Sequence, residues 1–274
     1  MPKPPFRSFR SLLPTLPLLA ALVALPALAS APPDAATRAR AAGYDAVGWL
    51  LADADGGIVT ESGDSLLDRP LLPASSFKPL IALVALETGV LRSRDDRVAW
   101  DGTRYPDQPG WEKDMALDEA MQTSSEPYFR ELARRIGHER LATWVARVDY
   151  GNGRIGPVAE RAWLDGVLRI TARQQLDFMT RLQAGELPFA PAHRAAVVES
   201  MRWRGEGDDG LFGKSGTALP STVSDRIGWW AGWAETDGVA HPFVLVVPLK
   251  AIDGRPKRIA LADALLADSG IPTP

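Results

Sequence analysis

The sequence reads Ile227-Gly228-Trp229-Trp230-Ala231-Gly232-Trp233 and, after an Asp237-Gly238 pair, Phe243-Val244-Leu245-Val246-Val247. Runs of β-branched and aromatic residues on either side of an Asp-Gly pair are typical of two antiparallel strands joined by a tight turn. Near the other end of the chain, residues 47–51 and 58–60 predict a second pair of strands. We therefore expect a sheet that draws its strands from both ends of the chain.

The residues between these strand pairs have a helical pattern. One helix is expected to begin at about Ser75, because proline at position 79 is tolerated only in a helix's first turn, and to end before Gly89. The expected fold is α+β: an antiparallel sheet built from both chain ends, with flanking helices and an inserted all-helical subdomain at about 112–203. Further helices are expected at 127–136, 138–148, 171–182, 191–203 and, closing the chain, 258–268.

The composition of the 274 residues excludes several kinds of chemistry. The absence of cysteine excludes disulfides, thiolate catalysis, iron–sulfur clusters and cysteine-bound zinc. The three histidines, at positions 138, 193 and 241, lack the spacing of metal ligands, so no metal site is predicted. A net charge of −3 argues against nucleic acid as a partner.

The first 29 residues are predicted to be a signal peptide. Lys3, Arg7 and Arg10 precede an apolar stretch at 12–24, and Ala27-Leu28-Ala29 fits the small-x-small cleavage pattern. Prolines interrupt this stretch, which argues against a membrane anchor. Cleavage would remove three positive charges and no negative ones, so that residues 30–274 would carry a net charge of −6. We expect a single periplasmic domain at 30–274, with no membrane association after cleavage.

Three short patterns contain residues that could carry chemistry. Ser75-Ser76-Phe77-Lys78 places a serine and a lysine one helical turn apart, and a lysine amine can take the proton of a nucleophilic serine. The alternative interpretation is a helix-capping serine before a surface lysine. Lys214-Ser215-Gly216-Thr217 enters a predicted strand and could face an extended substrate. Ser124-Ser125-Glu126 precedes a helix, where serine can simply cap.

In this order the three patterns form the signature of the penicillin-recognising serine enzymes. Over nearly the whole length of residues 30–274, the sequence resembles the class D β-lactamases (oxacillinases) of that superfamily. Tyr150-Gly151-Asn152 matches the box that separates class D from its relatives, and Trp163-Leu164-Asp165-Gly166 matches a further family segment. The resemblance implies an exported hydrolase that opens the cyclic amide of β-lactam antibiotics.

The resemblance also implies roles for the residues that form the catalytic centre. Ser75 would be the nucleophile that forms an acyl-enzyme, and Lys78, N-carboxylated by carbon dioxide, would be the general base. Ser124 would relay a proton to the β-lactam nitrogen, and the Trp163 indole would hydrogen-bond the carbamate. No other cofactor is implied.

Further residues are implied in substrate binding. Lys214 and Ser215 would help to bind the substrate carboxylate, with Arg258 as its main anchor. The backbone N–H groups of Ser75 and of Thr217, which follows Gly216, would form the oxyanion hole. The partner would be a small-molecule β-lactam, and the protein a monomer or dimer.

Some residues have no assigned role: Tyr150 and Asn152 are site candidates of uncertain role, and the arginine-rich stretch at 130–135 is expected to be a solvated helix face.

Glu126 departs from the family pattern, which is Ser-x-Val at this motif. A carboxylate beside a carbamate would place two anions in a dry pocket, which is unfavourable. Three outcomes are open: Glu126 turns to solvent, it pairs with an unmodified Lys78, or it activates the hydrolytic water itself. The rival functions are therefore a penicillin-binding D,D-peptidase and a slowly deacylating β-lactam-binding or sensor homologue.

Overall fold

The computed structural model describes residues 1–2, 34–220, 225–251 and 254–274, and for Asp64 only the backbone. Apart from residues 1 and 2, the predicted signal peptide lies outside these ranges. The fold is that of the compact unit at 33–274. None of the helices in the described part of the chain is long and apolar enough to cross a membrane.

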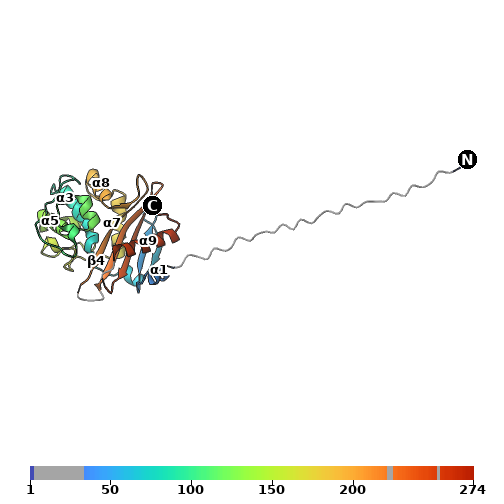
Figure 1. The fold of residues 1–274 in the computed structure, drawn as a ribbon, viewed down its shortest axis with the longest axis horizontal. Coiled ribbons are helices and arrows are strands. Elements are labelled where there is room, and N and C mark those ends of the chain that lie inside the picture. Colours follow the sequence, from blue (N-terminus) through green and yellow to red (C-terminus); the bar gives the residue numbers. More distant parts are fainter. Residues whose placement is uncertain (3–33, 221–224, 252–253) are drawn as a thin grey trace. The chain divides into compact units, whose positions relative to one another are not determined.

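Six antiparallel strands form one sheet, in the order β2-β1-β6-β5-β4-β3 (Figure 1). Two strands come from the N-terminal end of the chain and four from the C-terminal end, so the predicted α+β fold is confirmed. The strands are β1 (Gly48–Ala52), β2 (Ile58–Ser62), β3 (Arg202–Arg204), β4 (Gly210–Ala218), β5 (Ile227–Thr236) and β6 (Val239–Pro248).

Both faces of this sheet are covered, because successive side chains of a strand point to opposite faces. Trp230, with Phe243 and Leu245, packs in a core with α1 (Ala35–Ala41) and α9 (Arg255–Asp268). Trp229 and Trp233 point into the larger core on the other face, which α7 (Ala172–Gln183) covers. Strands β1, β5 and β6 therefore carry nearly continuous buried runs.

The remaining helices pack beside the sheet (Figure 1). The long buried helix α3 contacts α4, α5, α6 and α8, although it precedes the predicted insertion in sequence. Conversely, α7 lies within 112–203 and packs on the sheet, because its apolar side meets β5 and β6. The elements are α2 (Asp64–Leu67), α3 (Lys78–Glu87), α4 (Leu117–Thr123), α5 (Glu126–Ile136), α6 (His138–Arg147) and α8 (Pro191–Ser200), with 3₁₀ turns η1 (Ala74–Phe77), η2 (Pro109–Trp111) and η3 (Ala159–Arg161).

Three helix boundaries differ from the predicted ones by three residues. Ser75 lies in the 3₁₀ turn η1, and the α-helix proper begins at Lys78. The helix predicted at 191–203 ends at Ser200, because the backbone of 202–204 pairs with β4 as an edge strand. The closing helix begins at Arg255, three residues earlier than predicted, with proline in its first turn.

The centre of β5 provides a test of this packing. A Cβ atom at Gly232 would lie 1.9 Å from the Phe212 carbonyl oxygen, whereas one at Gly110 would have no atom within 4 Å. We expect Gly232→Ala to lower the free energy of unfolding by about 2–4 kcal/mol, since the strands must move apart. Gly110→Ala should change it by less than about 0.5 kcal/mol. Urea unfolding of both variants checks this, and equal effects would contradict the described packing.

Candidate active site

The Ser75 turn is pressed against strand β4. At Gly216 a Cβ atom would lie 3.0 Å from the Pro73 carbonyl oxygen and 3.1 Å from the Ser76 nitrogen, so only glycine allows this approach without displacement. Trp229 Nε1 donates to the Leu72 carbonyl at 2.9 Å, which fixes β5 to the residues before the turn. Ser75 itself is half-buried, so its hydroxyl lies at the edge of the core beside β4.

Ser124 lies between two lysine side chains. Its Oγ accepts from Lys78 Nζ at 3.0 Å and from Lys214 Nζ at 2.9 Å, while its carbonyl accepts from Lys78 Nζ at 2.6 Å. Ser124 ends α4 with φ at 54°, in the left-handed region that non-glycine residues rarely adopt. Such backbone strain is common where a side chain is held for function. The structure thus brings together three of the predicted site residues.

The Lys78 amine is almost completely removed from water. The residue is 1% exposed, and its Nζ lies 5.4 Å from the centre of the Phe129 ring. Burial lowers the pKa of Lys78 to about 7; the nearby Glu126 raises this pKa and Arg130 lowers it. Near neutral pH a large fraction of the amine is therefore unprotonated and able to act as a base.

Lys214 shares the same dry surroundings. It is 2% exposed, and its Nζ also donates to the Ser215 carbonyl at 3.0 Å. Burial, and then the proximity of Lys78, lower its pKa well below the usual lysine range. Because two ammonium groups would repel each other, the site disfavours the state in which both lysines are protonated. Each amine is hydrogen-bonded to Ser124 Oγ, through which a proton can be exchanged.

Trp163 has a buried indole that fits the carbamate expected on Lys78. Its Nε1 is buried and has no hydrogen-bond partner among the described residues. The ring stacks on Phe77, the residue before Lys78, at 6.3 Å between centroids. A buried N–H that lacks an acceptor costs free energy, and a carbamate oxygen on Lys78 would supply that acceptor. The residues present therefore fit an N-carboxylated lysine.

Glu126 is held by an ion pair on its own helix. Arg130 Nη2 lies 2.5 Å from Glu126 Oε1, and the Glu126 side chain is 32% exposed. No hydrogen bond or salt bridge joins Glu126 to Lys78 within the described part of the chain. Of the three outcomes open from the sequence, this geometry favours the one in which Glu126 points outward.

Arg258, expected to anchor a substrate carboxylate, is buried behind β4. It donates to the Gly216 carbonyl at 2.5 Å, to the Trp229 carbonyl at 3.0 Å and to Thr217 Oγ1 at 2.8 Å. Gly228 leaves the room for it, since a Cβ there would lie 2.8 Å from Arg258 Cδ. The guanidinium thus brings a positive charge to the strand that carries Lys214 and Thr217.

The structure does not place Tyr150 and Asn152 beside the reacting groups. The buried Tyr150 hydroxyl donates to Gln175 Oε1 at 2.8 Å, and its ring packs edge-on against Phe77. Asn152 Nδ2 donates to the Val167 carbonyl at 2.8 Å. Tyr150 thus packs against the residue before Lys78, and Asn152 joins its own turn to the backbone at Val167.

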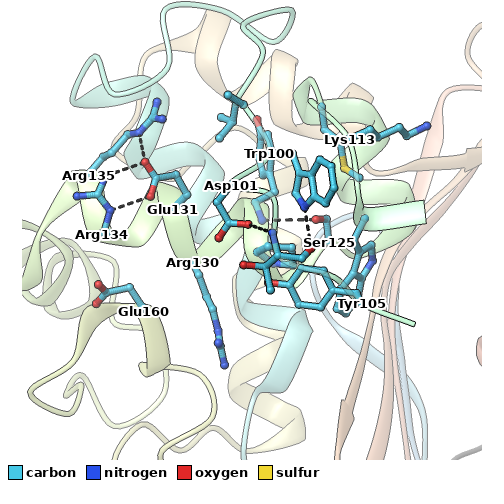
Figure 2. Close-up of a pocket in the computed structure, with 17 residues that line it drawn as sticks. Trp100, Asp101, Tyr105, Lys113, Ser125, Arg130, Glu131, Arg134, Arg135 and Glu160 are labelled. Atoms are coloured by element: carbon cyan, nitrogen blue, oxygen red, sulfur yellow. Dashed lines mark hydrogen bonds and ion pairs between the residues drawn. The ribbon is translucent and has the colours of Figure 1, made fainter. Parts of the chain in front are cut away.

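A cavity of about 710 Å³ lies next to the site, between α5 and the segment around Trp100 (Figure 2). Ser125 and Arg130 line it, so it reaches the first turn of α5. Figure 2 shows Glu131 bound to Arg134 and Arg135, as expected for a solvated helix face, while Arg130 extends away from them. The Arg130 side chain is 42% exposed, which agrees with the prediction for 130–135, although its Nε is buried.

Sequence reasoning missed three residues around the lysines: Phe129, Arg130 and Arg255. The spacing of Glu126 and Arg130 was a usable signal, because residues four apart on a helix are neighbours. Arg255 gave no such signal. It donates to the Gln122 carbonyl at 2.5 Å and stacks on Trp203, a contact that only the fold creates.

The chain is similar to known proteins over most of its length. The family described as the penicillin binding protein transpeptidase domain matches residues 53–267. The β-lactamase OXA-48 of Klebsiella pneumoniae is 33% identical over 204 residues, which cover 74% of this chain and 76% of that protein. A class D β-lactamase from Nostoc has a similar structure, with a TM-score of 0.81, 32% identity and coverage of 87% of this chain and 99% of that one.

A sensor protein is also among the relatives. The regulatory protein BlaR1 of Bacillus licheniformis is 34% identical over 166 residues, which cover 60% of this chain and 27% of that protein. This chain therefore corresponds to about a quarter of that regulator.

The buried Lys78 amine predicts a stability cost. Because the pKa is lowered in the folded state, the unfolded chain binds the additional proton between about pH 7 and 10.5, and stability rises with pH in this range. We expect the free energy of unfolding of Lys78→Met to exceed that of the original protein by about 1–4 kcal/mol at pH 6. This difference should shrink towards about pH 10.

Urea unfolding in buffer free of carbon dioxide measures this difference. Lys113→Met, which removes an exposed lysine paired with Glu119, is the matched control and should show no such gain. A Lys78→Met variant that is no more stable than the original protein at pH 6 would contradict the assigned burial cost.

Proposed function

The chain belongs to the class D β-lactamase family of hydrolases, and from this we propose that it hydrolyses the amide of β-lactam antibiotics through an acyl-enzyme on Ser75. The observation that carries the proposal is that the buried amines of Lys78, three residues after Ser75, and of Lys214 both donate to Ser124 Oγ. We further propose that residues 1–29 direct export to the periplasm, where the substrate is a small molecule and no metal is needed.

Acylation follows from the proton-accepting state of Lys78. The unprotonated Lys78 amine takes the Ser75 proton as Ser75 Oγ attacks the β-lactam carbonyl carbon. The N–H groups of Ser75 and Thr217 stabilise the negative charge on the carbonyl oxygen, since β4 lies directly against the Ser75 turn. Lys214, Ser215 and Arg258 bind the substrate carboxylate from the same strand and the helix behind it.

Ring opening requires a proton on the leaving nitrogen. Ser124 Oγ accepts from both lysines, and a hydroxyl has one proton of its own to donate. Ser124 therefore gives its proton to the nitrogen as the C–N bond breaks, and a lysine replaces that proton. This proton transfer from Lys78 through Ser124 to the leaving nitrogen requires no histidine.

Deacylation distinguishes a hydrolase from a binder. Carbon dioxide bound at Lys78 Nζ supplies a carbamate base that can activate the hydrolytic water. In this proposal the buried Trp163 Nε1, which has no hydrogen-bond partner among the described residues, would donate to that base, and the Phe129 and Phe77 rings would help to keep its surroundings dry.

A second candidate function is a slowly deacylating β-lactam sensor. The similarity to BlaR1 and the replacement of the expected valine by Glu126 favour it. In that case acylation would proceed as above, and the adduct on Ser75 would persist. A D,D-peptidase would acylate with stem-peptide substrates in the same way.

Substitution of the nucleophile tests the proposed reaction. We expect Ser75→Ala to lose the covalent benzylpenicillin adduct and at least about 10⁴-fold of kcat, because no other hydroxyl replaces Ser75 Oγ. Ser76→Ala is the matched control: Ser76 is buried and donates to the Pro73 carbonyl at 2.7 Å. Hydrolysis rates and intact mass measure both variants, and penicillin turnover by Ser75→Ala would refute the mechanism.

The carbamate has a separate test. Trp163→Phe keeps the stacked ring and removes the N–H, so we expect it to need roughly tenfold more bicarbonate for half-maximal carboxylation. The readout is the carbamate signal in ¹³C NMR with labelled bicarbonate. Trp233→Phe is the control, since Trp233 Nε1 is likewise buried with no partner among the described residues. An unchanged signal in Trp163→Phe would remove Trp163 from this role.

A further inference from the structure

The first turn of α5 faces the general base. Ser124, which accepts two hydrogen bonds from Lys78, precedes Glu126 by two residues. Phe129, on the same helix, places its ring 5.4 Å from Lys78 Nζ. A negative charge at Glu126 is therefore close enough to affect the protonation of Lys78, and it favours the charged ammonium form.

This effect opposes catalysis. A protonated Lys78 cannot take the Ser75 proton, and it cannot add carbon dioxide, since only the neutral amine is nucleophilic. An unpaired Glu126 would thus keep the base in its inactive form at neutral pH. A valine at this position would have no such effect, so this chain requires a compensating charge.

Arg130 supplies that charge. Its Nη2 lies 2.5 Å from Glu126 Oε1, and its Nε is buried with no hydrogen-bond partner in the part of the chain that the structure describes. Figure 2 shows that Arg130 stays apart from Glu131, although Glu131 binds both other arginines of the helix. Arg130 is therefore the arginine of this helix that is committed to Glu126.

We propose that Arg130 is a positioning residue for the general base: its ion pair holds the Glu126 carboxylate away from Lys78 and cancels that carboxylate's charge at the amine. The Glu126–Arg130 ion pair thereby takes the place of the uncharged side chain that a valine would provide at this position. The role of Lys78 as the base rests on the proposed function, whereas the electrostatic relation among the three side chains does not.

The charged groups that face Lys78 come from two elements, and a third contributes a polar group. Glu126 and Arg130 lie on α5, Lys214 lies on β4, and Ser124 at the end of α4 is polar but uncharged. Lys214 is unaltered in the variants below, so changes in Lys78 report on the pair alone. Because the two members of the pair have opposite signs, their removal should move the titration of Lys78 in opposite directions.

The test is the titration of Lys78 by ¹³C and ¹⁵N NMR, with labelled lysine in buffer free of carbon dioxide. The chain has only six lysines, and loss of a signal in Lys78→Met assigns the one of interest. Arg130→Met should raise the Lys78 midpoint by about one pH unit, and Glu126→Gln should lower it by a similar amount. The double variant should titrate near the original midpoint.

Arg134→Met is the matched control. Arg134 is an exposed residue one turn after Arg130 and pairs with Glu131, so its loss removes a similar ion pair that does not involve Glu126. We expect no shift in this variant. In the pH profile of the acylation rate, the acid limb of Arg130→Met should lie about one pH unit higher than that of the original protein. At a pH below this limb, acylation should therefore be about tenfold slower.

Shifts of the same sign in Arg130→Met and Glu126→Gln, no shift in either, or an equal shift in Arg134→Met would overturn the proposal. None of these outcomes depends on turnover, because the NMR titration observes the amine itself. If the two variants shift the Lys78 midpoint in opposite directions, as expected, but the protein does not hydrolyse penicillin, the role of the ion pair stands and the proposed function is refuted.

Discussion

The desolvation of one lysine amine is the constraint on which the site depends. Lys78 is 1% exposed, and removal from water lowers its pKa to about 7, so that an amine normally protonated at neutral pH is available as a base three residues after Ser75. The aromatic rings of Phe77, Phe129 and Trp163 create these dry surroundings. The same burial costs folding free energy, which the large apolar cores on both faces of the sheet offset.

The rest of the fold fixes the groups around that amine. Gly216 lets β4 approach the Ser75 turn, and Trp229 holds the residues before the turn to β5. Arg258 crosses behind both strands through three hydrogen bonds. The sheet and α3 therefore hold the site residues in place, whereas α5 contributes the charges of Glu126 and Arg130. Under the proposed function, one element positions the nucleophile and another determines whether its base is charged.

Much of this could be predicted from the sequence. Strand periodicity around Trp229 and Trp230 gave the antiparallel sheet, and the Ser75-to-Lys78 and Lys214-to-Gly216 patterns gave residues that the fold brings together. Trp203 was assigned to a helix, because local pattern cannot reveal pairing with a distant strand. Arg130 is solvated as predicted, but periodicity shows only which face of a helix is polar and not that a cavity borders that face.

The central claim is that Ser75 is acylated and then released by water. Intact-protein mass spectrometry during incubation with benzylpenicillin, with drug consumption followed in the same sample, tests it most directly. The account predicts a transient adduct of the mass of the intact drug and consumption of many equivalents of penicillin. A stoichiometric adduct that persists would contradict it and identify a penicillin-binding sensor, and the absence of any adduct or drug loss would exclude both functions.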